Sequence, residues 1–274
     1  MFRNFASFLK VSTLITVKRL NMSSVQNLKG KTAIVTASTE GIGFSIAKRL
    51  AQNGASVIIS SRKENNVKKA VEELKKCGLD VEGTVCHVGK EEDRKHLVQF
   101  ALDKKGAIDI LVSNAGINPY FGAFLDTPEE IWKKIFDVNV VAAFMITKEV
   151  VPQIEKRGGG SVIYISSIGG YQPFELLGSY SVSKTALLGL TKTMAMTCAP
   201  MNIRVNCIAP GLIKTKFSQA LTSNEHLVDE LRIPLRRVGE PDDIGGVAAF
   251  LCSDDASYIT GECVAVTGGI YAHL

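Results

Sequence analysis

The chain has 274 residues, of which 46% are hydrophobic and 22% are charged, a composition typical of a soluble globular protein. Four of its five net positive charges lie within residues 1–24, so the remainder is close to neutral, which argues against a nucleic-acid-binding protein. No apolar run approaches the roughly 20 residues that a membrane-spanning helix needs. The six cysteines and four histidines lack metal-ligand spacing, so we expect no metal site and no disulfide framework.

Both ends of the chain carry features of targeting segments. Residues 1–24 are basic, hydroxyl-rich and free of acids, which favours a mitochondrial presequence over a secretory signal because Lys10 interrupts the apolar stretch. A disordered tail is the alternative, and Met22 offers a second start site that would omit the leader. The terminal Ala272-His273-Leu274 is similar to a peroxisomal address of the Ser-Lys-Leu type, which an import receptor reads. Peroxisome, mitochondrion and cytoplasm therefore all stay open as locations.

From residue 31 onward, short apolar runs alternate with helical patterns. The runs expected as strands are 31–37, 55–61, 81–88, 108–116, 161–167, 202–211 and 262–269. The patterns expected as helices are 44–54, 64–78, 91–106, 128–160 as one helix or two, 179–199 and 241–253. Such alternation predicts parallel strands joined by right-handed crossovers. We therefore predict an α/β fold over residues 25–274: one domain with a Rossmann-type, doubly wound parallel sheet of seven strands and helices on both faces.

One polar segment, residues 214–236, does not fit this alternation. It leaves the carboxyl end of the sixth expected strand, the edge at which open α/β sheets bind ligands. We expect it to be a substrate lid. A surface excursion without ligand contact is the alternative.

The stretch VTASTEGIG (35–43) joins the first expected strand to the first helix. Small residues there let backbone N–H groups approach a pyrophosphate, and the helix N-terminus favours negative charge. Ala37 stands where a third glycine would be expected beside Gly41 and Gly43. Because a residue with a Cβ is poorly suited to positive φ, we predict that Ala37 has a negative φ.

The end of the second expected strand indicates which nicotinamide dinucleotide would bind. An acid there would bind the ribose 2′-hydroxyl of NAD, but the chain has Ser61, Arg62 and Lys63. A guanidinium can grip a 2′-phosphate with two parallel hydrogen bonds, which favours NADPH. The alternative is that Arg62 and Lys63 are only solvated charges at the start of a helix.

Several polar residues are expected at the same sheet edge. Tyr180 and Lys184 are four residues apart and so share one helix face, although this spacing is common on ordinary amphipathic helices. A neighbouring ammonium would lower the pKa of a phenol from about 10. Ser167 ends the fifth expected strand, Asn114 ends the fourth, and Asn139 lies in the helical stretch between them.

The motifs TASTEGIG, SNAG, DVNV, ISS, YSVSK and RVNCIAPG together resemble the short-chain dehydrogenase/reductase family across about residues 28–270. Within it, the chain is most similar to the NADPH-dependent carbonyl and retinal reductases, in which N-terminal extensions and peroxisomal C-termini occur. The resemblance implies that Tyr180 is the general acid toward the carbonyl oxygen and that Ser167 orients the carbonyl. It also implies that Lys184 holds the nicotinamide ribose and that Asn139 holds a proton-relay water.

The resemblance also implies a cofactor-binding set for NADP(H). This set comprises Thr36, Ser38, Gly41, Ile42, Gly43, Ser61, Arg62, His87, Val88, Asn114, Ala115, Gly116, Tyr180, Lys184, Pro210, Gly211, Ile213 and Thr215. Three departures from the family pattern stand out: Ala37, the sequence Cys86-His87-Val88 in place of an Asp-Val pair, and Glu40 where some NADPH members have a base. The last of these leaves Arg62 as the main expected ligand of the 2′-phosphate.

The expected function is reduction of a small carbonyl compound. The substrate residues expected are Ser167, Tyr171, Phe174 and Tyr180, with Phe217 as a further aromatic residue of the lid. An NAD(P)-dependent alcohol or steroid dehydrogenase working oxidatively is the second hypothesis, and a catalytically silent scaffold protein is the third. The resemblance also implies a homotetramer.

Overall fold

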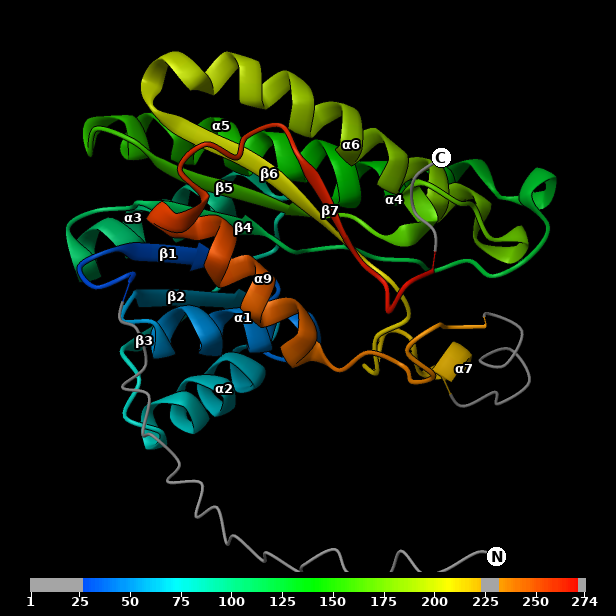
Figure 1. Cartoon of the computed structure of the whole chain (residues 1–274), viewed down its shortest axis with the longest axis horizontal. Coiled ribbons are helices and arrows are strands. Elements are labelled where there is room, and N and C mark those ends of the chain that lie inside the picture. Colours follow the sequence, from blue (N-terminus) through cyan, green and yellow to red (C-terminus); the bar gives the residue numbers. More distant parts are fainter. Residues whose placement is uncertain (1–26, 223–231, 271–274) are drawn as a thin grey trace, which may run out of the picture.

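The structure is a computed structural model, and the part of it described below comprises residues 27–222 and 232–270 (Figure 1). The basic leader, residues 223–231 of the expected lid, and the terminal Ala272-His273-Leu274 lie outside this part, so the predictions made for them stay predictions. None of the helices within the described residues is long and apolar enough to cross a membrane.

Seven parallel strands form one sheet, in the order β3-β2-β1-β4-β5-β6-β7. The strands are β1 (Thr32–Val35), β2 (Ser56–Ser61), β3 (Val81–Val85), β4 (Ile110–Ser113), β5 (Gly160–Ile165), β6 (Ile203–Pro210) and β7 (Cys263–Val266). Strand order reverses between β1 and β4, so the crevice outside their carboxyl ends is where a doubly wound sheet binds its ligand. The predicted Rossmann-type α/β fold is confirmed.

Helices cover both faces of the sheet (Figure 1). One layer contains α1 (Gly41–Gln52), α2 (Glu64–Lys76) and α9 (Pro241–Cys252), and the other contains α3 (Glu91–Lys105), α5 (Ala142–Lys156) and α6 (Gly178–Cys198). Two shorter helices, α4 (Glu129–Phe136) and α7 (Gln219–Thr222), lie toward the carboxyl edge. The expected helical stretch 128–160 consists of α4 and α5 joined by a π-helical turn, η2 (Asp137–Val141).

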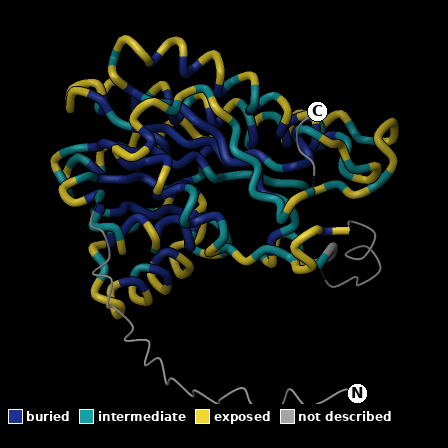
Figure 2. Tube along the Cα trace, in the orientation of Figure 1, coloured by how far each residue is buried: buried dark blue, intermediate teal, exposed yellow. Residues whose placement is uncertain are grey.

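The hydrophobic core is divided by the sheet into two clusters. One cluster packs α1, α2 and α9 onto one face, and the other packs α3, α5 and α6 onto the opposite face. Strands β1 and β4 are buried along their whole length, as Figure 2 shows by the dark central trace. Burial on both faces explains why these strands read as continuous apolar runs rather than as an alternation.

The prediction for the backbone at Ala37 is wrong, because its φ is +50°. Tertiary hydrogen bonds hold the turn in this left-handed conformation. The carbonyl oxygen of Ala37 accepts from Asn114 Nδ2 at 2.9 Å, and the next residue, Ser38, donates its backbone N–H to Ser60 O at 2.9 Å. The position therefore needs the conformational freedom of glycine, and alanine is accommodated at a cost in backbone strain.

Replacing Ala37 by glycine should relieve that strain. Left-handed backbone costs an L-residue roughly 1–2 kcal/mol, and the extra unfolded-state entropy of glycine offsets part of the gain. We expect Ala37→Gly to leave the free energy of unfolding unchanged or raised by up to about 1 kcal/mol, measured by urea unfolding at fixed protein concentration. The control Ala70→Gly, inside α2, should lower it by about 1 kcal/mol or more. Equal losses in the two variants would contradict the strain at Ala37.

Candidate active site

The glycine-containing turn between β1 and α1 is tightly packed against the end of β4. A Cβ added to Gly43 would lie 2.4 Å from Asn114 Nδ2 and 2.7 Å from Ala37 O, so no side chain fits there. Gly41 has a φ of +60°, and its Cβ position faces the Thr215 methyl group at 3.3 Å. The start of α1, with no side chain at Gly41 or Gly43, is therefore a cradle that permits the close approach of a pyrophosphate.

Thr36 and Asn114 connect the ends of β1 and β4 at the switch point of the sheet. The Thr36 hydroxyl accepts from the backbone N–H groups of Asn114 at 3.0 Å and Ala115 at 3.2 Å. In return, Asn114 Nδ2 donates to Thr36 O at 3.0 Å and to Ala37 O at 2.9 Å. These two predicted cofactor residues thus fix the geometry of the cradle.

Ser38 has a structural position rather than a surface one. It is fully buried, its hydroxyl donates to Val35 O at 2.6 Å, and it accepts from Ser60 N at 3.1 Å. Its side chain therefore connects β1 to β2. A contact of Ser38 with a ligand would have to come from its backbone.

The side chains after β2 are free to meet an anion. Ser61 is partly buried, whereas Arg62 and Lys63 are exposed and form no ion pair with another described residue. A phosphate at this place would therefore meet two cations that pair with no carboxylate of the described residues.

Side chains of α3 hydrogen-bond the backbone of the turn after β3. The backbone N–H of His87 donates to Asp93 Oδ2 at 2.8 Å, and the Val88 carbonyl oxygen accepts from Arg94 Nη1 at 2.8 Å. Arg94 is itself buried and pairs with Glu149 at 3.1 Å. His87 and Val88 therefore form a fixed turn at the edge where an adenine would lie.

Ser167 and Tyr180 come together from β5 and α6. Ser167 follows β5, and its hydroxyl accepts from Gly169 N at 3.0 Å. Burial raises the pKa of Tyr180 to about 12, and a hydrogen bond with the Ser167 hydroxyl opposes that rise. The pKa of Tyr180 is therefore raised, and not lowered as a neighbouring ammonium was expected to make it. Tyr180 is consequently a protonated phenol at neutral pH, able to donate a hydrogen bond.

Lys184 is the buried cation of the site, with only 3% of its surface exposed. Its Nζ donates to Ile165 O at 2.9 Å and lies 5.5 Å from the centre of the Tyr180 ring. Burial lowers the pKa of Lys184 to about 8. A Cβ at Gly116 would lie 3.1 Å from that Nζ, so Gly116 leaves the space that the ammonium needs.

Asn139 is turned inward by the π-helical turn between α4 and α5. Its Oδ1 accepts from Ile117 N at 2.8 Å, and its Nδ2 donates to Ile117 O and Ser183 Oγ, both at 3.0 Å. Its Oδ1 lies 3.6 Å from the Cβ position of Gly116, the position that also faces Lys184. Asn139, Gly116 and Lys184 are therefore adjacent.

Sequence reasoning missed Ser183, which joins Asn139 to the helix that carries Tyr180. Its hydroxyl accepts from Asn139 Nδ2 and donates to Tyr180 O at 2.6 Å. The only available signal was its position directly before Lys184. Sequence reasoning also missed the π-turn, for which the segment DVNVV carries no local pattern.

The aromatic residues expected around the substrate have different positions. The Phe217 ring lies 5.8 Å from the Tyr180 ring and is 59% exposed, so it flanks the mouth of the site. Phe174 Cδ2 and Ser167 Oγ both lie near the Cβ position of Gly169, at 3.6 and 3.4 Å. The Tyr171 hydroxyl instead donates to Cys263 O at 3.2 Å, which directs this side chain to β7.

The segment after β6 returns to the glycine cradle. Pro210 ends β6, and Gly211 donates its N–H to Val266 O at 2.9 Å. Ile213 is buried and bridges to Gly239, which closes the base of the 214–236 segment. Thr215, one of the residues predicted on the nicotinamide side, packs against Gly41 of the cradle.

Comparison with known proteins identifies the family. Residues 36–271 match a family model described as enoyl-(acyl carrier protein) reductase. Dehydrogenase/reductase SDR family member 4 from pig is 59% identical over 251 residues, 90% of this chain and 89% of the pig protein. The chain belongs to the short-chain dehydrogenase/reductase family. The predicted resemblance is confirmed, and the protein is an oxidoreductase of a family that uses a nicotinamide cofactor.

Two further members illustrate the range of that family. Human dehydrogenase/reductase SDR family member 2, mitochondrial, is 51% identical over 243 residues, 88% of this chain and 86% of the human one. The structure of a 7α-hydroxysteroid dehydrogenase complexed with NADH and 7-oxo glycochenodeoxycholic acid is 36% identical, with a TM-score of 0.86. It covers 92% of this chain and 98% of that one.

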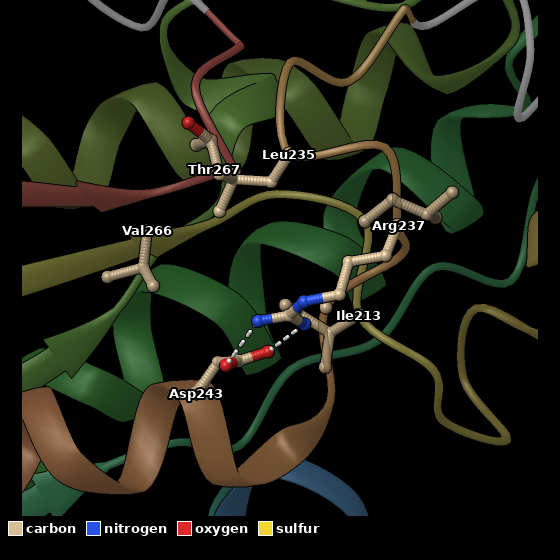
Figure 3. Close-up of a pocket in the computed structure, with 9 residues that line it drawn as sticks. Ile213, Leu235, Arg237, Asp243, Val266 and Thr267 are labelled. Carbon is tan, nitrogen blue, oxygen red and sulfur yellow. Dashed lines mark hydrogen bonds and ion pairs between the residues drawn. The ribbon is translucent and has the colours of Figure 1, made fainter. Parts of the chain in front are cut away.

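The far side of the post-β6 segment is fastened to α9. Arg237 donates two hydrogen bonds to Asp243, at 2.7 and 2.9 Å (Figure 3), and Asp243 also accepts from Glu240 N at 2.8 Å. These bonds lower the pKa of Asp243 to about 2. Beside the pair is a cavity of about 140 Å³ lined by Ile213 and Leu235 among others. The cavity lies where the segment contacts α9, so it is part of the contact that anchors the segment and not part of the Tyr180 site.

The Arg237–Asp243 pair should make stability depend on acid. A carboxylate with a depressed folded-state pKa stabilises the fold above its unfolded pKa near 4, and this contribution disappears as pH falls toward 2. We expect Arg237→Gln to lower the free energy of unfolding only slightly at pH 7, since the pair is partly exposed. Urea titrations from pH 7 to 2 should show the difference from wild type vanish. A constant difference would contradict the assignment.

Proposed function

We propose that the protein is an NADPH-dependent carbonyl reductase that transfers hydride to apolar ketones, dicarbonyls or retinal. The observation that carries the proposal is the assembly of Ser167, Tyr180 and Lys184 at the carboxyl edge of β5, beside a cradle without side chains. The bound cofactor would supply the hydride, and the protein supplies the proton and the orientation.

In this proposal Tyr180 is the general acid. Negative charge grows on the carbonyl oxygen during reduction, and a neutral phenol held in a partly buried position donates to it without prior reorganisation. The raised pKa of Tyr180 keeps that proton in place at neutral pH. Ser167, hydrogen-bonded to the same phenol, would donate to the carbonyl oxygen and fix its direction.

Lys184 would bind the nicotinamide ribose and favour the ionised form of Tyr180 once the proton has left. Its ammonium is buried 5.5 Å from the phenol ring, where screening by water is weak. Asn139 would hold a water between itself and Lys184 that returns a proton from solvent. Gly116 keeps open the space that the two residues share.

The cofactor-binding residues would divide the dinucleotide among three regions. Gly41, Ile42 and Gly43 would take the pyrophosphate at the start of α1, while Arg62 would take the 2′-phosphate. The adenine would lie by His87 and Val88, and the nicotinamide by the residues that follow β6. Glu40 does not oppose the phosphate alone, because Lys216 pairs with it at 2.6 Å.

The second hypothesis is an alcohol or steroid dehydrogenase that works oxidatively. It is favoured by the likeness to the 7α-hydroxysteroid dehydrogenase complexed with NADH. The two hypotheses share Ser167, Tyr180 and Lys184 and differ in cofactor and direction. Steady-state rates with each of the four nicotinamide cofactors would separate them.

Self-association as a homotetramer is part of the proposal. Apolar side chains remain exposed on the outer sides of α5 and α6, including Phe144, Val182 and Met196, the last at 81%. Such a surface is typical of an interface between subunits. We also propose that residues 214–236 form the substrate lid, which Phe217 beside Tyr180 supports. Import into the peroxisome or the mitochondrion rests on the two chain ends and on the name of the human relative.

Removing the Tyr180 hydroxyl should abolish reduction and spare cofactor binding. We expect Tyr180→Phe to lower kcat for carbonyl reduction by roughly 10²- to 10⁴-fold, because the positioned proton donor is lost. NADPH fluorescence titration should give a Kd within about twofold of wild type. The control Tyr258→Phe, at a fully exposed tyrosine, should change neither value. Undiminished reduction by Tyr180→Phe would refute the mechanism.

Arg62 should decide the preference for NADPH. We expect Arg62→Asp to raise the KM for NADPH by roughly 10²-fold, through lost phosphate bonds and added repulsion, and to change the KM for NADH little. Lys63→Asp is the matched control, because it alters a neighbouring exposed charge. Its effect should be much smaller. Equal effects of Arg62→Asp on both cofactors would exclude Arg62 as the phosphate ligand.

A further inference from the structure

Two cysteines lie side by side on the last two strands of the sheet. Cys207 in β6 and Cys263 in β7 are direct register partners. Adjacent strands are about 4.8 Å apart, which lies within the range of Cα separations found in disulfides, about 4.4–6.8 Å. β7 is the edge strand, so Cys263 lies at the border of the sheet rather than at its centre.

Both sulfur atoms lie on the α6 face. Cys207 is fully buried in that core, and Cys263 is partly buried against it. The two thiols interact with each other, and the Tyr171 hydroxyl donates to Cys263 O at 3.2 Å. Because direct partners on neighbouring strands project to the same face of the sheet, the two cysteine side chains lie next to each other.

Cys263 differs from the other cysteines in its electrostatic surroundings. The hydrogen bond from Cys207 lowers the pKa of Cys263, and the Lys192 ammonium acts in the same direction, although burial opposes both. Burial instead raises the pKa of Cys86 and of Cys252 to about 12. Because the thiolate is the nucleophilic form, Cys263 is the more reactive of these thiols.

We propose that Cys207 and Cys263 form a peroxide-reactive dithiol that closes reversibly to a disulfide between β6 and β7. The proposal is independent of which carbonyl compound the enzyme reduces. Cys263 is the attacking sulfur, since it is partly exposed and surrounded by donors. Cys207, buried behind it, is the resolving sulfur.

The chemistry balances with a hydroperoxide as the oxidant. The Cys263 thiolate attacks the terminal peroxide oxygen, the O–O bond breaks, and the departing oxygen takes a proton to leave as water or an alcohol. The Cys207 sulfur then attacks the Cys263 sulfenic acid, forms the S–S bond, loses its proton and expels the hydroxyl as water. The two thiols lose two electrons in total, and the peroxide gains them.

Cys207 also lies within electrostatic reach of Lys184, the lysine proposed above to bind the nicotinamide ribose. Lys184 and Cys207 influence each other electrostatically, and the neighbour of Cys207, Ile208, accepts from Ser166 N at 2.8 Å. A disulfide would remove the thiol proton of Cys207 near Lys184 and would join β7 to β6 covalently. Oxidation of Cys207 and Cys263 would therefore change the electrostatic surroundings of Lys184.

The test is thiol mapping of the full chain carrying Cys77→Ser, which removes the exposed cysteine. The protein is treated with hydrogen peroxide, and catalase then removes the remaining peroxide. The protein is next unfolded in denaturant in the presence of N-ethylmaleimide, which alkylates the free thiols, and it is analysed by mass spectrometry without reduction. We expect the number of alkylated cysteines to fall from about five to about three per chain, with a peptide that links Cys207 to Cys263. Dithiothreitol should restore the original number.

The control variants separate this pair from general oxidation. Cys252→Ser removes a buried thiol elsewhere and should leave the linked peptide unchanged, whereas Cys263→Ser should lose it. The mapping of the Cys77→Ser chain decides the question even if Cys263→Ser does not fold. Persistence of both thiols after treatment, or conversion of Cys263 to a sulfinic acid without the link, would overturn the proposal.

Discussion

The rest of the site depends on the way in which Thr36 and Asn114 bind the ends of β1 and β4 together. Four hydrogen bonds of 2.9–3.2 Å satisfy the backbone groups that a parallel sheet leaves open at its switch point. The Asn114 amide comes so close to the α1 turn that Gly43 has no room for a side chain. The packing of Asn114 against Gly43 thus keeps the cradle free of a side chain at Gly43 and fixes it to the end of β4. The chain that continues from β4 brings Gly116 next to Lys184.

Burial of Lys184 is the second condition on which the chemistry rests. An ammonium taken out of water loses hydration energy, and its lowered pKa records that loss. The carbonyl of Ile165 compensates part of it, and the position is held because Ser166 Oγ donates to the Lys184 carbonyl at 2.8 Å. A cation that has lost hydration in this way interacts strongly with any negative charge that develops nearby. In the proposed mechanism, the Tyr180 oxygen is the group that would carry such charge.

The sequence predicted the fold well because apolar runs and helical stripes are local signals that the sheet only had to assemble. All seven strands lie within their expected ranges or extend beyond them by one residue, as β5 does at Gly160. Ala37 was mispredicted because its φ is imposed by Asn114, which is 77 residues away. Ser38 and Tyr171 were expected to face ligands by motif position alone, whereas hydrogen bonds to β1, β2 and β7 direct their side chains elsewhere. Contacts between distant segments leave no trace in local spacing.

The segment after β6 is attached strongly to α9 and to itself at its base, and weakly to the cradle. At its base, Asp243 accepts three hydrogen bonds, two of them from a guanidinium, and the Ile213–Gly239 bridge closes the chain on itself. Near the cradle, Lys216 reaches Glu40 through one exposed ion pair, which is worth about 1 kcal/mol or less. A lysine held so weakly can exchange a carboxylate for a phosphate oxygen at little cost. Lys216 therefore places a positive charge beside the start of α1, although position 40 itself is Glu40 and not a basic residue.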